Sequence, residues 1–333
     1  MKQYTDYSLR AHNTFGIEAR CKRYVAYESV AEAQTVAALL RQAGASFLII
    51  GGGSNLLLTA DYDGTVVRSE IKGICRQGVL LRCGSGEVWD DVVTRALEEH
   101  LYGAENLSII PGDVGASAVQ NIGAYGSEVA SIIDSIEAVE IATGNVVTLR
   151  AGECGYAYRY SRFKDEWRNR YLITRVTYRL SETFSPLLDY GNIRSYLEQQ
   201  NITSPTADDI RQAVIAIRRA KLPEPSVLGN AGSFFMNPVV DREKYESLAK
   251  VYPDMPHYVI DADHEKIPAG WMIEQCGWKG RRMGAAGVHD KQALVLVNHG
   301  GASGADIISL CRAIQKDVAE KFGIDIKPEV NIV

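Results

Sequence analysis

An apolar segment that runs directly into a glycine-rich turn constrains this chain more than any other feature. Residues 47–50 read Phe-Leu-Ile-Ile, and Gly51-Gly52-Gly53-Ser54-Asn55 follow at once. The segment is typical of a buried strand, and residues 24–27 predict another. Between them, Ser29 with Glu32 three residues later indicates a helix start, and Gly44 indicates its end. Residues 24–50 therefore predict a strand, a helix and a second strand that opens onto the glycine turn.

The glycine turn excludes two common nucleotide sites. A dinucleotide fingerprint would need glycine at position 56, where Leu56 stands, and no Gly-Lys-Ser/Thr ending follows for a P-loop. Taken alone, the turn is either a flexible connection or a place where backbone N–H groups approach a phosphate. Two more junctions of small residues follow, Gly84-Ser85-Gly86 and the run IIPGDVGASAVQNIGAYG at 109–126. Three such places favour an extended ligand with a pyrophosphate, such as a dinucleotide.

The rest of the chain alternates strands and helices. Residues 88–97 have helical spacing, 136–141 and 146–149 predict a hairpin, and 171–180 predict another strand. A helix that begins at Asp208 or Asp209 ends at Lys221-Leu222-Pro223-Glu224-Pro225, where we place a domain boundary. Beyond it, a strand at 293–297, a helix from Ser303 to Gly323 and an extended segment at 324–333 predict a small α+β unit.

Composition narrows the class of protein. The 333 residues predict about two or three domains. They are 46% hydrophobic and 23% charged, with no stretch of the roughly 18 unbroken apolar residues that a membrane helix needs. A net charge of −5 lacks the basic excess of nucleic-acid-binding proteins. No secretory signal is visible, so we expect a cytoplasmic protein with a small-molecule partner, no nucleic acid and no membrane. The six cysteines and six histidines show no metal-ligand spacing, so no metal is expected and the cysteines are interpreted as reduced thiols.

Several motifs, in order along the chain, together resemble the UDP-N-acetylenolpyruvoylglucosamine reductase family. The long string Gln120-Asn121-Ile122-Gly123-Ala124-Tyr125-Gly126 is the most specific of them. The others are Asn13-Thr14-Phe15-Gly16-Ile17, Gly51 to Asn55, Ile110-Pro111-Gly112, Tyr158-Arg159 with Ser161 and Phe163-Lys164, Gly229-Asn230-Ala231-Gly232-Ser233-Phe234-Phe235, Ala269-Gly270-Trp271 and Pro328-Glu329-Val330. Leu188-Asp189-Tyr190-Gly191 is similar to the extra tyrosine loop of the family's type I form.

The resemblance implies an α+β flavoprotein. Its FAD-binding fold would be of the vanillyl-alcohol-oxidase (PCMH) type in two subdomains, residues 1–70 with 323–333 and residues 71–220. Residues 221–322 would form a smaller α+β domain for the UDP-sugar. The enzyme would use NADPH as co-substrate to reduce UDP-N-acetylglucosamine enolpyruvate to UDP-N-acetylmuramate, a peptidoglycan precursor, and we expect a monomer.

The resemblance also assigns the cofactor contacts. Gly51 to Asn55 would hold the FAD pyrophosphate, and residues 110–125 would line the rest of the flavin. The expected FAD-binding residues are Gly51, Gly52, Gly53, Ser54, Asn55, Ile110, Pro111, Gly112, Val114, Gly115, Ser117, Ile122, Gly123 and Arg159.

Three catalytic residues follow from the resemblance, and their chemistry suits the reaction. Arg159 is permanently charged and can bind a carboxylate with two hydrogen bonds, and Glu329 would polarise the same enolate-like intermediate. Ser233, flanked by two phenylalanines, would supply the proton. Read without the family, each has an ordinary structural role: a salt-bridged arginine, a solvated carboxylate and a turn hydroxyl.

The expected UDP-sugar ligands are cationic, amide and aromatic side chains, which suit a diphosphate and a uracil ring. They are Tyr125, Tyr190, Arg218, Lys221, Asn237, Tyr258 and Gln292. Two positions depart from the family: Met236 stands where lysine is common, and Asn331 where arginine is often found. Each departure removes a positive charge, which puts diphosphate affinity or NADPH handling in doubt.

Two other functions remain open at this stage. A different oxidoreductase on the same scaffold, acting on a small alcohol or sugar, would keep residues 51–55 but have no use for Ser233 and Glu329 together. A nucleotide-sugar-binding protein without catalysis would be colourless and would not take up FAD.

Overall fold

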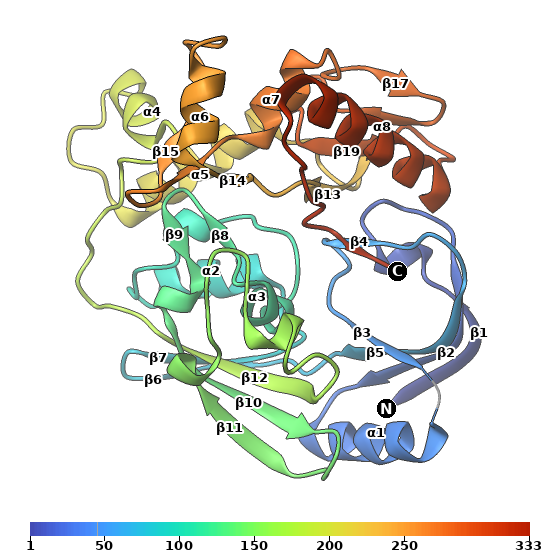
Figure 1. The fold of residues 1–333 in the computed structure, drawn as a ribbon. Helices are drawn as coiled ribbons and strands as arrows, with labels where there is room; N and C mark the ends of the chain where they lie inside the picture. Colours follow the sequence, from blue (N-terminus) through green and yellow to red (C-terminus); the bar gives the residue numbers. More distant parts are fainter. Residues whose placement is uncertain (45) are drawn as a thin grey trace. The chain divides into compact units, whose positions relative to one another are not determined.

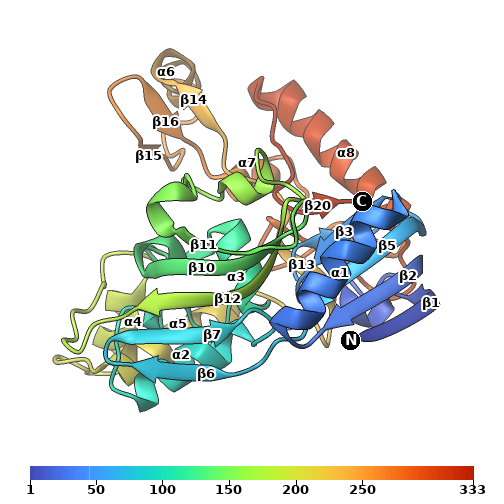
Figure 2. The same cartoon turned by 90° about the horizontal axis from the view of Figure 1, so that it is seen from below.

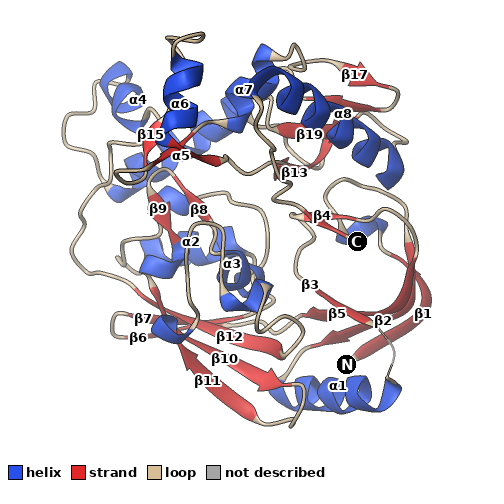
Figure 3. Cartoon of the chain, viewed as in Figure 1, coloured by secondary structure: helices blue, strands red, loops and turns tan. Residues whose placement is uncertain are grey.

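The computed structural model describes residues 1–44 and 46–333, which form two compact units. Unit 1 contains Met1–Tyr7, Cys21–Gly52 and Tyr62–Ala220, and unit 2 contains Ser8–Arg20, Gly53–Asp61 and Lys221–Val333. The chain therefore passes from unit 1 to unit 2 inside the glycine turn, between Gly52 and Gly53. Each unit mixes helices and strands (Figure 3), and we describe each by itself. The expected three-part division of the chain stays a prediction.

Unit 1 holds almost all of a four-stranded sheet. Its order is β1 (Lys2–Ser8), β2 (Arg20–Tyr27), β5 (Tyr62–Ser69) and β3 (Phe47–Ile50). Strands β2 and β3 both pair in parallel with β5, as a strand-helix-strand crossover requires. The connecting helix α1 (Val30–Ala43) begins after Ser29, whose hydroxyl accepts the N–H of Glu32, and ends at Gly44 with φ +54°. This confirms the predicted strand, helix and strand.

A second, five-stranded antiparallel sheet also belongs to unit 1, and its strands run side by side in Figure 2. Its order is β11 (Val146–Arg150), β10 (Ile133–Glu140), β12 (Tyr171–Arg179), β7 (Leu80–Gly84) and β6 (Ile74–Gln77). Helices α2 (Trp89–Glu98) and α3 (Val114–Gln120) pack on it through Trp89, Val93, Val114 and Ala118 (Figure 1). The predicted hairpin and the strand at 171–180 are confirmed.

The remaining elements of unit 1 are short except for one helix. They are β8 (Gly123–Ala124), β9 (Ser127–Glu128), α4 (Ile193–Gln199) and α5 (Ala207–Lys221), whose last residue belongs to unit 2. Helix α5 buries Ile210, Val214 and Ile217 against α4, as its spacing predicts.

Unit 2 is built from two small sheets, a strand pair and three helices. One antiparallel sheet has the order β13 (Gly229–Ser233), β19 (Val295–Asn298), β18 (Ala286–Val288) and β17 (Arg282–Met283). The other has the order β14 (Val239–Asp241), β16 (His264–Lys266) and β15 (Tyr258–Val259). The parallel pair is β4 (Leu56–Leu57) with β20 (Asn331–Ile332). The helices are α6 (Arg242–Ala249), α7 (Ala269–Gln275) and α8 (Gly304–Phe322).

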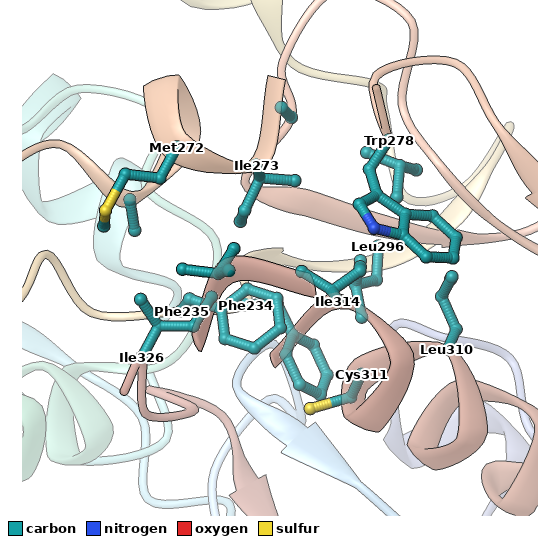
Figure 4. Packing of buried hydrophobic residues seen from close by; sticks show 14 of the residues in the cluster. Phe234, Phe235, Met272, Ile273, Trp278, Leu296, Leu310, Cys311, Ile314 and Ile326 are labelled. Carbon is teal, nitrogen blue, oxygen red and sulfur yellow. The ribbon is translucent and has the colours of Figure 1, made fainter. Parts of the chain in front are cut away.

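One apolar core joins these elements of unit 2. Met272 and Ile273 of α7, Leu310 and Ile314 of α8, and Leu296 of β19 surround Phe234 and Phe235 (Figure 4). Ser303 caps α8 in a reciprocal arrangement with Asp306, and Gly323 ends it at φ +61°, so the predicted helix is confirmed. Within the described residues, no helix has both the length and the apolar character to cross a membrane.

Candidate functional site

The glycine turn after β3 closes tightly against the start of α3. A Cβ built at Gly51 would lie 2.8 Å from the Cβ of Ala116, and one at Gly52 would lie 3.1 Å from Asp113 Oδ1 and 3.3 Å from Gly112 Cα. Side chains at 51 and 52 would therefore collide with residues 112–116. Glycine lets the two segments touch, and both belong to unit 1.

This turn presents backbone donors beside a buried ion pair. In the described part of unit 1, the N–H groups of Gly51 and Gly52 donate no hydrogen bond, so they can serve an anion. Nearby, Arg68 Nη2 lies 3.3 Å from Asp113 Oδ2. Burial raises the pKa of Asp113, and Arg68 only partly opposes this effect. The turn fits a pyrophosphate, because glycine excludes side chains and leaves donors exposed.

The glycines of the second junction serve the protein itself. A Cβ at Gly84 would lie 2.3 Å from the carbonyl oxygen of Ile71, and one at Gly86 would lie 2.7 Å from Glu70 Cα. Residues 70 and 71 thus occupy the space that the sequence left open for a ligand. At 84 and 86, glycine is needed for packing between chain segments of unit 1.

The first turn of α3 is already bonded internally. The N–H groups of Val114, Gly115 and Ser117 donate to the carbonyl oxygens of Glu87, Ser85 and Asp113. The Ser117 hydroxyl donates to Val114 O at 2.7 Å and lies 3.0 Å from the hydroxyl of Tyr178. Val114 and Ser117 are buried, Pro111 is exposed, and Ile110, Gly112, Ile122 and Gly123 are half-buried. Their contact with FAD stays a prediction, and Val114, Gly115 and Ser117 chiefly shape the start of α3.

Two arginines and a tyrosine form a cationic cluster in unit 1. Arg159 has φ +55°, and its Nη2 donates to Gly123 O at 2.7 Å. Lys164 Nζ donates to the carbonyl oxygen of Arg159 at 2.9 Å, which supports this unfavourable backbone conformation. Burial and the like charge of Arg159 lower the pKa of Arg218, while Tyr125 opposes the shift. Among the described residues, Arg218 Nε has no hydrogen-bond partner. Such a cluster is a natural anion site.

The Tyr190 loop lies against the Tyr125 turn. A Cβ built at Gly126 would be 3.2 Å from Tyr190 Cβ, and one at Gly191 would overlap the Tyr125 ring, 2.3 Å from Cδ1. Asn106 joins the two loops, because its Nδ2 donates to Tyr125 O and to Leu187 O, both at 3.0 Å. Unit 1 therefore brings together Tyr125, Arg159, Tyr190 and Arg218.

Unit 2 brings Ser233 and Glu329 together. Ser233 ends β13 opposite Val295, and the N–H of the next residue, Phe234, donates to Leu294 O at 2.7 Å. The N–H of Glu329 donates to Phe234 O at 2.8 Å, and Phe235 forms an isolated bridge with Pro328. The phenylalanines are fully buried in the core of Figure 4, so they fix the backbone that carries Ser233 and to which Glu329 is hydrogen-bonded.

The end of the glycine turn is hydrogen-bonded to the segment that carries Glu329. Asn55 Nδ2 donates to Glu329 O at 3.4 Å, and Asn331 donates to Asn55 O from both its N–H at 3.2 Å and its Nδ2 at 3.1 Å. Position 53 requires glycine, because its φ is +70° and an added Cβ would lie 2.0 Å from the carbonyl oxygen of His12. Asn331, one of the two departures from the family, thus joins the end of the turn to β20, just after Glu329.

The other expected substrate residues of unit 2 are more dispersed. Asn237 Oδ1 accepts the N–H of Ala269 at 2.9 Å at the start of α7, and Gln292 Oε1 would lie 3.1 Å from a Cβ at Gly270. Tyr258 is exposed, with Lys266 Nζ 5.5 Å from its ring centre. Lys221 is the last residue of α5. Met236, the second departure, uses its N–H to bind Lys327 O at 2.9 Å.

The expected catalytic trio is divided between the units. Arg159 belongs to unit 1, whereas Ser233 and Glu329 belong to unit 2. The sequence reasoning missed Asp113, Asn106 and Lys164 as supports of these segments. The partners of Asp113 and Asn106 lie in other segments that no local spacing relates to them, whereas Lys164 is only five residues from Arg159.

Two family models match the chain. A model described as an FAD binding domain matches residues 21–150, and a model described as the C-terminal domain of UDP-N-acetylenolpyruvoylglucosamine reductase matches residues 224–333. The FAD-binding model covers the glycine turn at residues 51–55, and the C-terminal model covers Ser233 and Glu329.

Curated relatives match over nearly their whole length. UDP-N-acetylenolpyruvoylglucosamine reductase of Bacteroides fragilis is 52% identical over 332 residues, 98% of this chain and 99% of the relative. That of Paraburkholderia phymatum is 46% identical and covers 97% of this chain and 96% of the relative.

Solved structures support the same fold. The Thermus caldophilus UDP-N-acetylenolpyruvylglucosamine reductase has a TM-score of 0.69 at 22% identity and covers 99% of this chain and 98% of that one. The 6-hydroxy-D-nicotine oxidase of Arthrobacter nicotinovorans has a TM-score of 0.52 at 14% identity, covering 92% and 82%.

The fold and the glycine turn define an FAD-dependent oxidoreductase. The predicted fold class, an FAD-binding fold of the vanillyl-alcohol-oxidase type with a smaller α+β domain, is confirmed. The chain belongs to the UDP-N-acetylenolpyruvoylglucosamine reductase family, as its motifs predict.

Proposed function

We propose that this protein reduces UDP-N-acetylglucosamine enolpyruvate to UDP-N-acetylmuramate with NADPH, and that Arg159, Ser233 and Glu329 act on the enolpyruvyl group. One observation carries the proposal. The hydrogen bond from Glu329 N–H to the carbonyl oxygen of Phe234, the residue after Ser233, holds Ser233 and Glu329 on adjoining chain segments, and Asn55 of the glycine turn donates to the carbonyl oxygen of Glu329. A proton donor and a carboxyl group beside the cofactor turn are what this reduction needs.

FAD, which the glycine turn would hold, would supply the redox chemistry: a hydride taken from NADPH and passed to the terminal carbon of the enolpyruvyl double bond. The electron pair of that double bond moves onto the carbon next to the carboxylate, and Arg159 would stabilise the negative charge that spreads into the carboxylate oxygens. Glu329 would polarise the same group. The Ser233 hydroxyl would then give its proton to the carbon beside the carboxylate, which completes a saturated lactyl ether. The buried Phe234 and Phe235 would help to exclude water from this step.

The cationic cluster supports binding of the UDP-sugar. Arg218 is largely desolvated, carries an Nε with no partner among the described residues and lies within electrostatic reach of Arg159. Two guanidinium groups within electrostatic reach of one another favour binding of an anion, and this substrate carries two anionic groups, the diphosphate and the enolpyruvyl carboxylate. Tyr125 and Tyr190, packed at the same turn, would contact it from unit 1, and Lys221, Asn237, Tyr258 and Gln292 from unit 2. We also infer that the protein acts as a monomer in the cytoplasm.

The experiment is an anaerobic half-reaction. The purified holoprotein is reduced with NADPH until the visible absorbance of oxidised flavin is lost, and UDP-N-acetylglucosamine enolpyruvate is then added. We expect the absorbance to return, because the enolpyruvyl group accepts the hydride. UDP-N-acetylglucosamine, which lacks that group, is the control and is expected to leave the flavin reduced. A yellow protein that stays bleached with the enolpyruvyl substrate would keep the scaffold and refute the substrate.

A further inference from the structure

One carboxylate in unit 1 joins three segments that are far apart in sequence. Asp90 is the second residue of α2, and its Oδ1 accepts the N–H of Ile109 at 2.6 Å. The same carboxylate receives both arms of the Arg211 guanidinium, with Nη1 2.7 Å from Oδ1 and Nη2 2.8 Å from Oδ2. Arg211 Nη2 also donates to Thr94 Oγ1 at 2.9 Å. This two-pronged geometry is the most directional form of an arginine-carboxylate pair.

On one side, Asp90 is hydrogen-bonded to the first residue of segment 109–112, which includes the expected FAD contacts Ile110, Pro111 and Gly112 and is called the flavin loop below. Ile109 has φ +50°, a conformation that a β-branched residue adopts only under constraint. The N–H of Trp89, the neighbour of Asp90, donates to Gly112 O at 3.0 Å. The first turn of α2 is therefore hydrogen-bonded to both ends of residues 109–112. Gly112 also packs against Gly52 of the glycine turn.

On the other side, Asp90 holds the helix that carries Arg218. Arg211 and Arg218 are seven residues apart on α5, about two helical turns, so they lie on the same face of the helix. Burial lowers the pKa of Arg218, and Asp90 opposes this shift, which places the carboxylate within electrostatic reach of that guanidinium. Although burial favours a raised pKa for Asp90, its bonds to Arg211 and to Ile109 N–H hold it below its ordinary value. Asp90 is therefore ionised at neutral pH, where it faces the cationic Arg211.

We propose that Asp90 is a positioning residue for the reduction of the UDP-sugar: through Arg211 it sets α5, and hence Arg218, in register with the flavin loop at residues 109–112. Asp90 itself touches neither substrate nor cofactor. The inference rests on the proposed function, because Arg218 is there a ligand of the diphosphate.

The test separates substrate binding from flavin reduction. Asp90→Asn keeps the shape and an acceptor for Ile109 N–H, but it removes the charge and one acceptor for Arg211. We expect the KM for UDP-N-acetylglucosamine enolpyruvate to rise about tenfold, since coupled neighbours in one network typically contribute such amounts. FAD content and the anaerobic rate of flavin reduction by NADPH are expected to stay near those of the wild type.

Asp91→Asn is the matched control, because Asp91 is an exposed aspartate on the same helix and the change in charge is identical. It is expected to leave KM unchanged. Arg211→Gln is expected to raise KM to a similar extent, and the double variant Asp90→Asn with Arg211→Gln is expected to be no worse than either single variant. If Asp90→Asn does not fold, Arg211→Lys, which keeps the charge and loses the two-pronged geometry, is expected to raise KM by a smaller factor.

The contrary outcomes are distinct. An unchanged KM in the folded variants, an additive double variant, or an equal loss in flavin reduction would overturn the positioning role. If the enolpyruvyl substrate does not reoxidise the NADPH-reduced flavin of the wild-type holoprotein, the proposed function is refuted, and this inference with it.

Discussion

The backbone N–H of Glu329 donates to the carbonyl oxygen of Phe234 at 2.8 Å, although most of the Lys221–Val333 segment lies between them in sequence. Phe234 follows Ser233 directly, so the bond holds the proposed proton donor and the proposed carboxyl group on adjoining chain segments. The ring of Phe234 is fully buried beside Phe235. The core of unit 2 thus determines the relative position of two groups on its edge.

Replacing Ser233 tests the proton-donor role. Ser233→Ala is expected to leave flavin reduction by NADPH nearly intact and to slow flavin reoxidation by the enolpyruvyl substrate by about 10²- to 10⁴-fold, the usual contribution of a positioned acid. Anaerobic stopped-flow absorbance measures the two steps separately. Ser309→Ala, on the exposed face of α8, is the control and is expected to change neither. Equal losses in both half-reactions would contradict the role.

Replacing Arg218 tests the anion site of unit 1. Arg218→Ala is expected to raise the KM for the UDP-sugar by about 10- to 100-fold, the size of a lost hydrogen bond to a charged group. The next residue on α5, Arg219, is exposed, so Arg219→Ala removes the same charge without touching the cluster. Steady-state kinetics of both variants decide the matter. An equal rise in the KM of both variants would show that the effect comes from net charge and not from the cluster.

Filling the glycine turn tests its closure on α3. Gly51→Ala adds a Cβ that would lie 2.8 Å from that of Ala116, so it is expected to cost about 1–3 kcal/mol of unfolding free energy and to lower FAD content. Gly152→Ala is the control, because nothing lies within 4 Å of its added Cβ. Flavin absorbance per protein and thermal unfolding measure both effects. Full FAD content in Gly51→Ala would mean that the turn yields without loss of the site.

The buried carboxyl of Asp113 predicts a pH dependence of stability. Burial raises the pKa of Asp113, with Arg68 in partial opposition, so its contribution to stability is present below the ordinary carboxyl pKa and is lost as the pH rises through the folded value. Asp113→Asn does not titrate, so its Tm relative to wild type is expected to increase as the pH rises above the ordinary carboxyl pKa and through the raised pKa of folded Asp113. Asp208→Asn, at an exposed site of unit 1, is expected to show no such trend. A difference in Tm that is constant with pH would contradict the shift.

The sequence by itself determined the local elements and the family. Ser29 with Glu32 and Ser303 with Gly323 set the ends of α1 and α8, because caps act within a few residues of the helix they close. The apolar segment before Gly51 became β3 for the same local reason. The motif strings named the family through their joint order, which no single contact could reveal.

Only the tertiary structure decided what each glycine and polar group does. Gly51 packs closely against Ala116, and Gly84 packs closely against the backbone of Ile71. In the sequence, both are simply glycines of a turn. Asp90 finds Arg211 only when α2 and α5 pack together, and nothing in the local spacing of either residue predicts the pair. Local propensity acts over a few residues, whereas ion pairs, strand neighbours and close backbone approaches depend on which distant segments the core brings into contact.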